Sequence, residues 1–133
     1  MCGIAGVFTP RAVAPRCADA AAMLAVLAHR GPDGSGEWQS PDRRYVALFR
    51  RLAIIDLETG DQPLHDAAGE YVLTANGEIY NYVELRANAS GYPFRTQGDM
   101  ESILPLVRRH GDAFVEQLNG MFALALYDRA SHR

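Results

Sequence analysis

Apolar residues along the chain follow two different periods, and each period predicts a different kind of element. Short uninterrupted apolar runs bounded by Gly, Pro, Asn or Asp indicate strands, whereas an apolar stripe at three- and four-residue spacing indicates a helix. We therefore predict strands over residues 4–8, 45–49, 52–57, 71–75 and 121–127, helices over residues 18–29 and 82–89, and a third helix capped by Asp99 that contains Ile103 to Val107.

Three segments carry a more specific expectation. Residues 29–36 are dense in Gly, Pro and Asp, which is typical of a turn. Pro105 lies within the third predicted helix, so we expect either a kink there or a helix that begins later. Residues 121–127 are apolar at every position, which favours a strand buried on both faces.

The order of the predicted elements is strand, helix, several strands, two helices and a strand. This order favours an α+β fold with sheets packed together and helices outside them over a parallel βαβ alternation. The 133 residues contain no internal repeat and make one domain of ordinary size. Because the last predicted strand is followed by only a few polar residues, we expect the chain to be a fragment of a longer one.

Composition excludes several classes of function. All thirteen positively charged residues are Arg, so a lysine Schiff base and a lysine-containing phosphate loop are excluded. The net charge of −3 argues against binding to nucleic acid or an anionic membrane. Two cysteines are too few for a disulfide scaffold or a four-cysteine zinc site, and the four histidines lack metal-binding spacing, so we expect no metal. The absence of a targeting or membrane segment predicts a cytoplasmic protein with reduced thiols.

Cys2 is the first candidate for chemistry. It is either a small buried residue beside a strand or, once Met1 is removed, a residue that carries both a thiol and a free α-amine. Such an amine has a reference pKa of about 7.7–8.0 and can serve as the base for its own nucleophile.

Two further groups of residues have both a structural and a functional interpretation. Asn76-Gly77 is either a hairpin turn or an oxyanion hole made of a side-chain amide and a backbone N–H. Arg51, Glu78 and Asp99 taken singly are typical of surface or helix-capping positions. Taken together, they could bracket a free amino acid, with the cation on its carboxylate and the anions on its ammonium.

Five segments in one order resemble the class II glutamine amidotransferase domain of glutamine-hydrolysing asparagine synthetases. The resemblance covers nearly the whole chain. The segments are Met1 to Gly6, His29 to Gly34, Arg51 to Asp56, Asn76 to Asn81 and Gly120 to Ala123.

This resemblance implies an N-terminal-nucleophile hydrolase fold, an αββα sandwich of two antiparallel sheets between helical layers. It implies that Cys2 attacks the side-chain amide of L-glutamine, that a γ-glutamyl thioester forms, and that water releases glutamate. By the same resemblance, Asn76 and Gly77 form the oxyanion hole, Arg51 binds the α-carboxylate, Glu78 and Asp99 bind the α-amine, and Leu52, Ala53, Ile54 and Ile55 line the glutamine pocket.

The resemblance also implies what lies outside residues 1–133. Relatives continue with further strands of this domain and then with a synthetase domain that uses ATP and Mg²⁺, so we expect a truncated amidotransferase domain without those strands. Ammonia would pass to an ATP-activated acceptor such as aspartate, and the full-length protein could be a homodimer.

Two alternatives stay open at this point. Natural-product synthetases that close rings or form amides with ATP can retain a silent amidotransferase-like domain. If Met1 is retained, the nitrogen of Cys2 is acylated and the fragment is inactive. The active interpretation expects the Cys2 sulfur near the Asn76–Gly77 corner and Arg51 turned away from bulk solvent.

Overall fold

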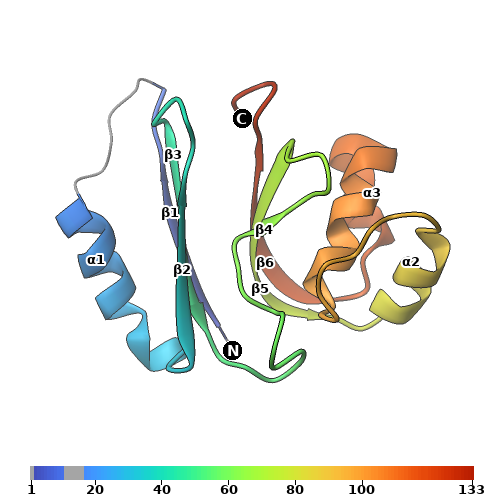
Figure 1. The fold of residues 1–133 in the computed structure, drawn as a ribbon, viewed down its shortest axis with the longest axis horizontal. Helices are drawn as coiled ribbons and strands as arrows, with labels where there is room; N and C mark the ends of the chain where they lie inside the picture. Colours follow the sequence, from blue (N-terminus) through green and yellow to red (C-terminus); the bar gives the residue numbers. More distant parts are fainter. Residues whose placement is uncertain (1, 11–16) are drawn as a thin grey trace.

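The structure, a computed structural model that describes residues 2–10 and 17–133, consists of helices and strands in four layers (Figure 1). In chain order the elements are β1 (Gly3–Phe8), α1 (Cys17–Val26), η1 (Ala28–Arg30), β2 (Gly34–Gln39), β3 (Tyr45–Arg51), β4 (Leu64–His65), β5 (Tyr71–Ile79), α2 (Tyr82–Asn88), η2 (Met100–Ser102), α3 (Ile103–His110), η3 (Gly111–Gln117) and β6 (Gly120–Asp128). The strands form two antiparallel sheets, ordered β1-β3-β2 and β4-β5-β6. Helix α1 covers the outer face of the first sheet, and α2 and α3 cover that of the second, so the expected αββα sandwich is confirmed.

The first sheet has β3 at its centre, and β3 is apolar along most of its length because both of its faces are covered. Val46 and Leu48 point to the helix layer and pack with Ala20 of α1. Tyr45 and Ala47 point the other way and pack against the second sheet. The two-residue period of a strand thus divides one apolar run between two separate clusters.

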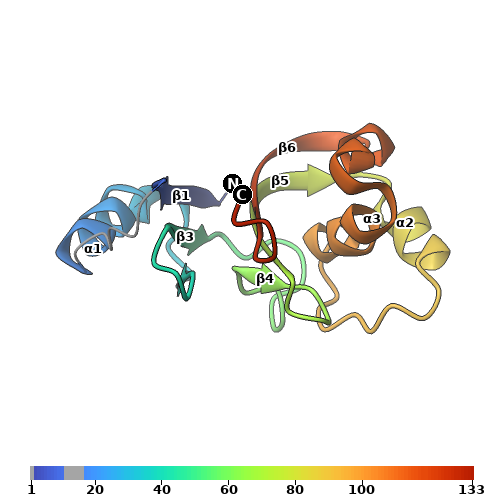
Figure 2. The same cartoon turned by 90° about the horizontal axis from the view of Figure 1, so that it is seen from above.

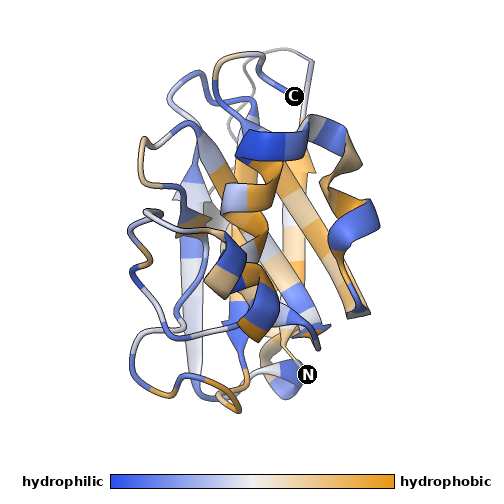
Figure 3. Ribbon diagram, turned by 90° about the vertical axis from the view of Figure 1, so that its right-hand side faces the viewer, coloured by the Kyte–Doolittle hydropathy of each residue, from blue (hydrophilic) through white to orange (hydrophobic). Residues whose placement is uncertain are grey.

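The second sheet packs on α3 through alternate residues of β5. Leu73, Ala75 and Ile79 are buried against Ile103 and Val107 of that helix. Figure 3 shows hydrophobic strands lying behind helices whose outward-facing segments are largely hydrophilic. This largest cluster of the described residues fixes the outer helical layer to the sheet.

The two sheets face each other, with their helices at opposite sides of the molecule (Figure 2). An aromatic cluster joins them at one end. The rings of Tyr45 on β3 and Tyr127 on β6 stack with centroids 5.0 Å apart and planes at 18°, and the ring of Trp38 lies 5.7 Å from that of Tyr127.

Most of the predicted elements are confirmed, but the predicted strand over residues 52–57 is wrong. The N–H of Leu52 donates to the sulfur of Cys2, and the N–H of Ala53 donates to the Asp33 carboxylate at 2.8 Å. Asp56 has a φ of 53°, in the left-handed region. This apolar segment is therefore a loop, and its backbone N–H groups donate to side chains and not to a neighbouring strand.

Part of the turn predicted over residues 29–36 is instead the start of β2, Gly34–Gln39. A Cβ on Gly36 would lie 1.7 Å from the carbonyl oxygen of Gln62, so glycine is required by a close approach of the backbone. The glycines in this segment therefore mark a crowded strand in addition to a turn.

Two expectations about the third helix have mixed outcomes. Asp99 precedes η2 but makes no capping hydrogen bond with its side chain, so the predicted cap is wrong. The expectation of a later start is confirmed, since α3 begins at Ile103 and Pro105 lies in its first turn. Proline is tolerated in a first turn because those N–H groups have no partner within the helix.

The expectation that the last strand is buried on both faces is also wrong. Strand β6 is at the edge of its sheet, and Met121 is 54% exposed. Phe122, Leu124 and Leu126 pack toward the helices, whereas Met121 points to the space between the sheets. Within the described residues, no helix is long and apolar enough to cross a membrane.

Asp66 holds the turn between β4 and β5, and its carboxylate is fully buried. It accepts hydrogen bonds from the N–H groups of Tyr71 (2.8 Å) and Ala68 (3.3 Å) and pairs with Arg108 of α3 at 2.6 Å. Burial acts to raise the pKa of Asp66, but the hydrogen bonds from Tyr71, Arg108 and Ala68 outweigh burial and hold the pKa below its usual value.

We predict that Asp66→Asn lowers the free energy of unfolding by about 1–3 kcal/mol at neutral pH, because it removes charge-assisted hydrogen bonds. Since the pKa is lower in the folded chain, the contribution of the carboxylate is present above the unfolded pKa of about 3.9 and is lost as pH falls through the folded pKa. Denaturant unfolding of wild type and variant at several pH values measures this. A stability difference that does not shrink below about pH 4 would contradict the assignment.

Candidate active site

Cys2 reaches the end of β3 because β1 pairs with β3 in a register that places Gly3 opposite Arg50. The N–H of Leu52 donates to the Cys2 sulfur at 3.3 Å, and the thiol donates to the Leu52 carbonyl oxygen at 3.5 Å. The Nε of Arg30 donates to the Cys2 carbonyl oxygen at 3.2 Å. The thiol is half-buried and its position is fixed by main-chain groups. Met1, whose removal is expected from the sequence if Cys2 is active, lies outside the described residues.

The thiol opens onto a cavity between the two sheets. The cavity has a volume of about 130 Å³. Its lining includes the predicted residues Cys2, Arg51, Leu52, Ile54, Ile55, Gly77, Glu78 and Asp99. Two predicted residues, Ala53 and Asn76, do not line it.

Asn76 and Gly77 lie within β5 and pair with Ala123 and Phe122 of β6, so the hairpin-turn interpretation is wrong. Gly77 has a φ of 149° and lines the cavity. The side-chain oxygen of Asn76 is buried, and it has no hydrogen-bond partner among the described residues.

Arg51 is turned inward and is only 8% exposed. Its Nη1 donates to the carbonyl oxygen of Leu57 at 3.2 Å and to the Asp61 carboxylate at 3.1 Å, and its Nη2 donates to the carbonyl oxygen of Asp56. A guanidinium has five N–H donors, so donors remain for a carboxylate in the cavity.

The two predicted carboxylates lie on the other wall. Asp99 is 7% exposed, and its Oδ2 accepts a hydrogen bond from the N–H of Ile79 at 2.8 Å. Glu78 lines the cavity from β5 and makes no ion pair with the other described residues. The cavity thus has a cationic side chain at the end of β3 and two anionic groups on the other wall, charges that are complementary to those of a free amino acid.

Four residues at the site are absent from the sequence-based prediction. Arg30 and Asp33 belong to the segment interpreted as a turn, and they bind the main chain of Cys2 and Ala53. Asp56 and Glu101 accept hydrogen bonds from the loop before Asp99. Arg30 and Asp33 could have been noticed as charged side chains beside Gly or Pro. Such residues are also common in turns, so the local sequence alone did not point to a role at the site.

Residues 2–10 and 17–133 contain no group of three or more His, Cys, Asp or Glu side chains that could hold a metal ion.

The arrangement of sheets and helices is similar to that of a solved structure. Among solved structures, the chain is similar to glutamine phosphoribosylpyrophosphate amidotransferase from B. subtilis in complex with ADP and GMP, with a TM-score of 0.51 and 22% identity. The match covers 63% of this chain and 21% of that one. At this identity the similarity concerns the fold alone, and that fold is the N-terminal-nucleophile hydrolase sandwich.

Comparison of sequences identifies the family. The family described as "Glutamine amidotransferase domain" matches residues 1–133, so the chain belongs to it. The chain is 48% identical over 104 residues to a probable glutamine-hydrolysing asparagine synthetase of Schizosaccharomyces pombe, covering 77% of this chain and 18% of that protein. It is 42% identical over 130 residues to asparagine synthetase B of Escherichia coli, covering 96% and 23%. The chain thus spans about a fifth of the length of these relatives.

Gly77 lies where β5 and β6 approach each other closely beside the cavity. A Cβ at Gly77 would lie 2.0 Å from the carbonyl oxygen of Met121 and 2.6 Å from the Cα of Phe122, so the strands β5 and β6 would have to separate. Gly91 also has a positive φ, but no atom lies within 4 Å of the position that a Cβ would take there, so it is a matched control for backbone strain alone.

We predict that Gly77→Ala destabilises the fold by about 1–3 kcal/mol more than Gly91→Ala, because both variants carry the strain of a positive φ but only Gly77 meets backbone atoms. Denaturant unfolding of the two variants measures the difference. Equal losses of stability would show that the close approach at Gly77 is not a constraint.

Proposed function

We propose that this chain hydrolyses the side-chain amide of L-glutamine, with the sulfur of Cys2 as the nucleophile. The observation that carries the proposal is that one cavity is lined by the Cys2 thiol, by the inward-facing Arg51 and by the Asp99 carboxylate. Membership in the glutamine amidotransferase domain family supports the same substrate.

In the proposed reaction, removal of Met1 frees the α-amine of Cys2, which takes the proton of the thiol as the sulfur attacks the amide carbon. Asn76 and the backbone at Gly77 stabilise the oxyanion that forms. The C–N bond then breaks, the leaving nitrogen takes the proton and departs as ammonia, and a γ-glutamyl thioester remains. Water adds to the thioester, which releases glutamate and regenerates the thiol.

Substrate binding follows from the charges of the cavity. Arg51 binds the α-carboxylate, and Glu78 and Asp99 bind the α-ammonium, with Leu52, Ile54 and Ile55 alongside. Anchoring both charged groups positions the neutral amide at the thiol, which converts binding energy into orientation.

We further propose that the chain is the glutaminase part of an asparagine-synthetase-like protein of the cytoplasm. The curated relatives, each about five times as long as the aligned segment, support this. In that protein a synthetase domain would use ATP and Mg²⁺ to activate an acceptor such as aspartate, which the ammonia attacks.

We predict that Cys2→Ala in the full-length protein abolishes glutamine hydrolysis but leaves ATP-dependent amide formation from added ammonium salt. Alanine at position 2 still permits removal of Met1, so the variant changes the thiol alone. Ammonia release from glutamine measures the first activity. Normal glutamine hydrolysis by a folded Cys2→Ala protein would refute the proposal.

We predict that Asn76→Ala lowers kcat for glutamine by about 10²–10³-fold, because one oxyanion donor is worth about 2.7–4 kcal/mol. KM should change little, since the donor acts on the oxyanion formed in the transition state. Steady-state kinetics separates the two parameters, and a rise in KM at constant kcat would assign Asn76 to substrate binding instead.

The acceptor is tested separately with the full-length protein, aspartate, ATP and glutamine. Formation of asparagine supports the synthetase assignment. Glutamine hydrolysis without asparagine would instead favour a different acceptor, as in a natural-product synthetase. Intact-mass measurement shows whether Met1 has been removed, and retention of Met1 with no ammonia release would favour the inactive fragment.

A further inference from the structure

Residues 95–98 lie between α2 and η2 and belong to no helix or strand, yet two of them, Thr96 and Gly98, line the cavity. Their main-chain groups are nonetheless bonded. Three consecutive N–H groups, those of Arg95, Thr96 and Gln97, donate to carboxylates, and the carbonyl oxygens of Thr96 and Gly98 accept from Arg86. Charged side chains therefore replace the hydrogen bonds that regular secondary structure would supply.

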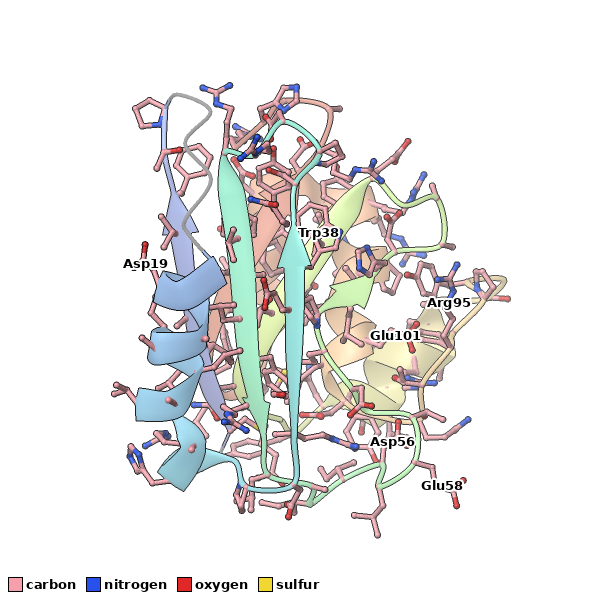
Figure 4. All side chains as sticks on the ribbon, turned by 60° about the vertical axis from the view of Figure 1, so that its left-hand side comes forward. Asp19, Trp38, Asp56, Glu58, Arg95 and Glu101 are labelled. Atoms are coloured by element: carbon pink, nitrogen blue, oxygen red, sulfur yellow. The ribbon has the colours of Figure 1, made fainter. Side chains whose placement is uncertain are left out.

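The two carboxylates come from opposite sides of the segment. Glu101, which is 2% exposed, follows the segment in η2 and accepts from Arg95 N–H at 2.9 Å and from Thr96 N–H at 2.7 Å. Asp56 comes from the loop after β3 and accepts from Gln97 N–H at 2.8 Å. Figure 4 shows both side chains on the same side of the molecule as Arg95. Glu101 is close to the segment in sequence and bonds it locally. Asp56 lies 41 residues away from Gln97 and connects the segment to a distant part of the chain.

Asp56 contacts both walls of the cavity. Its carbonyl oxygen accepts from Nη2 of Arg51, the candidate carboxylate anchor. Its carboxylate accepts from the N–H of Gln97, two residues before Asp99, the candidate amine anchor. The same carboxylate is fixed by the N–H of Thr59 at 2.9 Å and by the Thr59 hydroxyl at 2.5 Å. One residue thus joins the two groups between which a free amino acid would lie.

We propose that Asp56 is a positioning residue that sets the separation between Arg51 and Asp99, and that it thereby selects amides carrying both an α-carboxylate and an α-ammonium. This inference rests on the proposed function. A site that holds two charged groups at a fixed distance discriminates against a substrate that lacks one of them, because its buried partner is then left unpaired.

Asp56 must be ionised to accept all of the hydrogen bonds that join the two walls of the cavity. Burial acts to raise the pKa of Asp56, but the hydrogen bonds from Thr59, Gln97 and Gly98 outweigh burial and hold the pKa below its usual value. A carboxylate only accepts hydrogen bonds, so it can serve several donors at once.

The test uses Asp56→Asn in the full-length protein with two amide substrates, glutamine and glutaramate, which has the carboxylate but no α-ammonium. Asparagine has nearly the same size and tolerates a positive φ, and it leaves the main-chain contact to Arg51 in place. Its NH₂ group cannot accept the hydrogen bonds that the second carboxylate oxygen accepts.

We expect kcat/KM for glutamine to fall about ten-fold, the loss of a hydrogen bond to a charged group, and kcat/KM for glutaramate to fall far less. The preference for glutamine over glutaramate should therefore decrease about ten-fold. Glu58→Gln is the matched control, since Glu58 is exposed on the same loop and points away from the body of the molecule in Figure 4. It should leave both values unchanged.

A parallel loss for both substrates, or an unchanged preference, would overturn the inference. Thr59→Val removes one hydrogen bond to Asp56 and keeps the carboxylate, so it decides the matter if Asp56→Asn does not fold. Thr59→Val should also lower the preference for glutamine over glutaramate, by a smaller factor than Asp56→Asn. An unchanged preference would overturn the inference. Failure of the proposed function is distinguishable, because wild-type protein would then release no ammonia from glutamine.

Discussion

The antiparallel pairing of β1 with β3 is the constraint on which the site depends. With Gly3 opposite Arg50, the residue before β1 lies beside the residue after β3, and the sulfur of Cys2 meets the main chain of Leu52. A slip of one residue would turn every side chain of β1 to the other face. The register is fixed because Ala5 packs against the α1 side of the sheet, so the core of the first sheet also sets the position of the thiol.

Part of the cavity wall is built from loops, and charged side chains bond the main chain of these loops as a neighbouring strand or helical turn would. Arg51 binds three groups of the segment that follows it, and Arg86 binds two carbonyl oxygens before Asp99. The guanidinium of Arg86 also lies 3.9 Å from the ring centroid of Phe94. Such loops can keep polar groups directed at a ligand, because their own main-chain groups are already satisfied.

Apolar periodicity was sufficient to predict most elements and the sandwich, because each strand of the core divides its residues between two faces. It failed over residues 52–57, where hydrogen-bond acceptors distant in sequence take the N–H groups that a strand would use. It also missed β2, since Gly36 is required by a backbone that approaches from residue 62. Both failures have the same cause, a contact between segments that no local pattern contains.

The candidate site likewise contains residues that could be predicted from their type and residues that could not. Cys2, Arg51 and Asp99 carry their chemistry in their residue type and were predicted, and the structure brings them to one cavity. Asp33 and Asp56 act on main-chain groups 20 and 41 residues away, so their positions in sequence gave no signal. The roles assigned to the individual site residues stay predictions until the variants are measured.

The aromatic stack of Tyr45 and Tyr127 lies at the opposite end of β3 and β6 from the cavity. The two sheets are therefore packed together through these rings at one end and separated by the cavity at the other. Because a close-packed interior transmits small displacements, a change in ring size at the stack would alter the angle between the sheets. The width of the cavity is thus controlled partly by residues that no substrate touches.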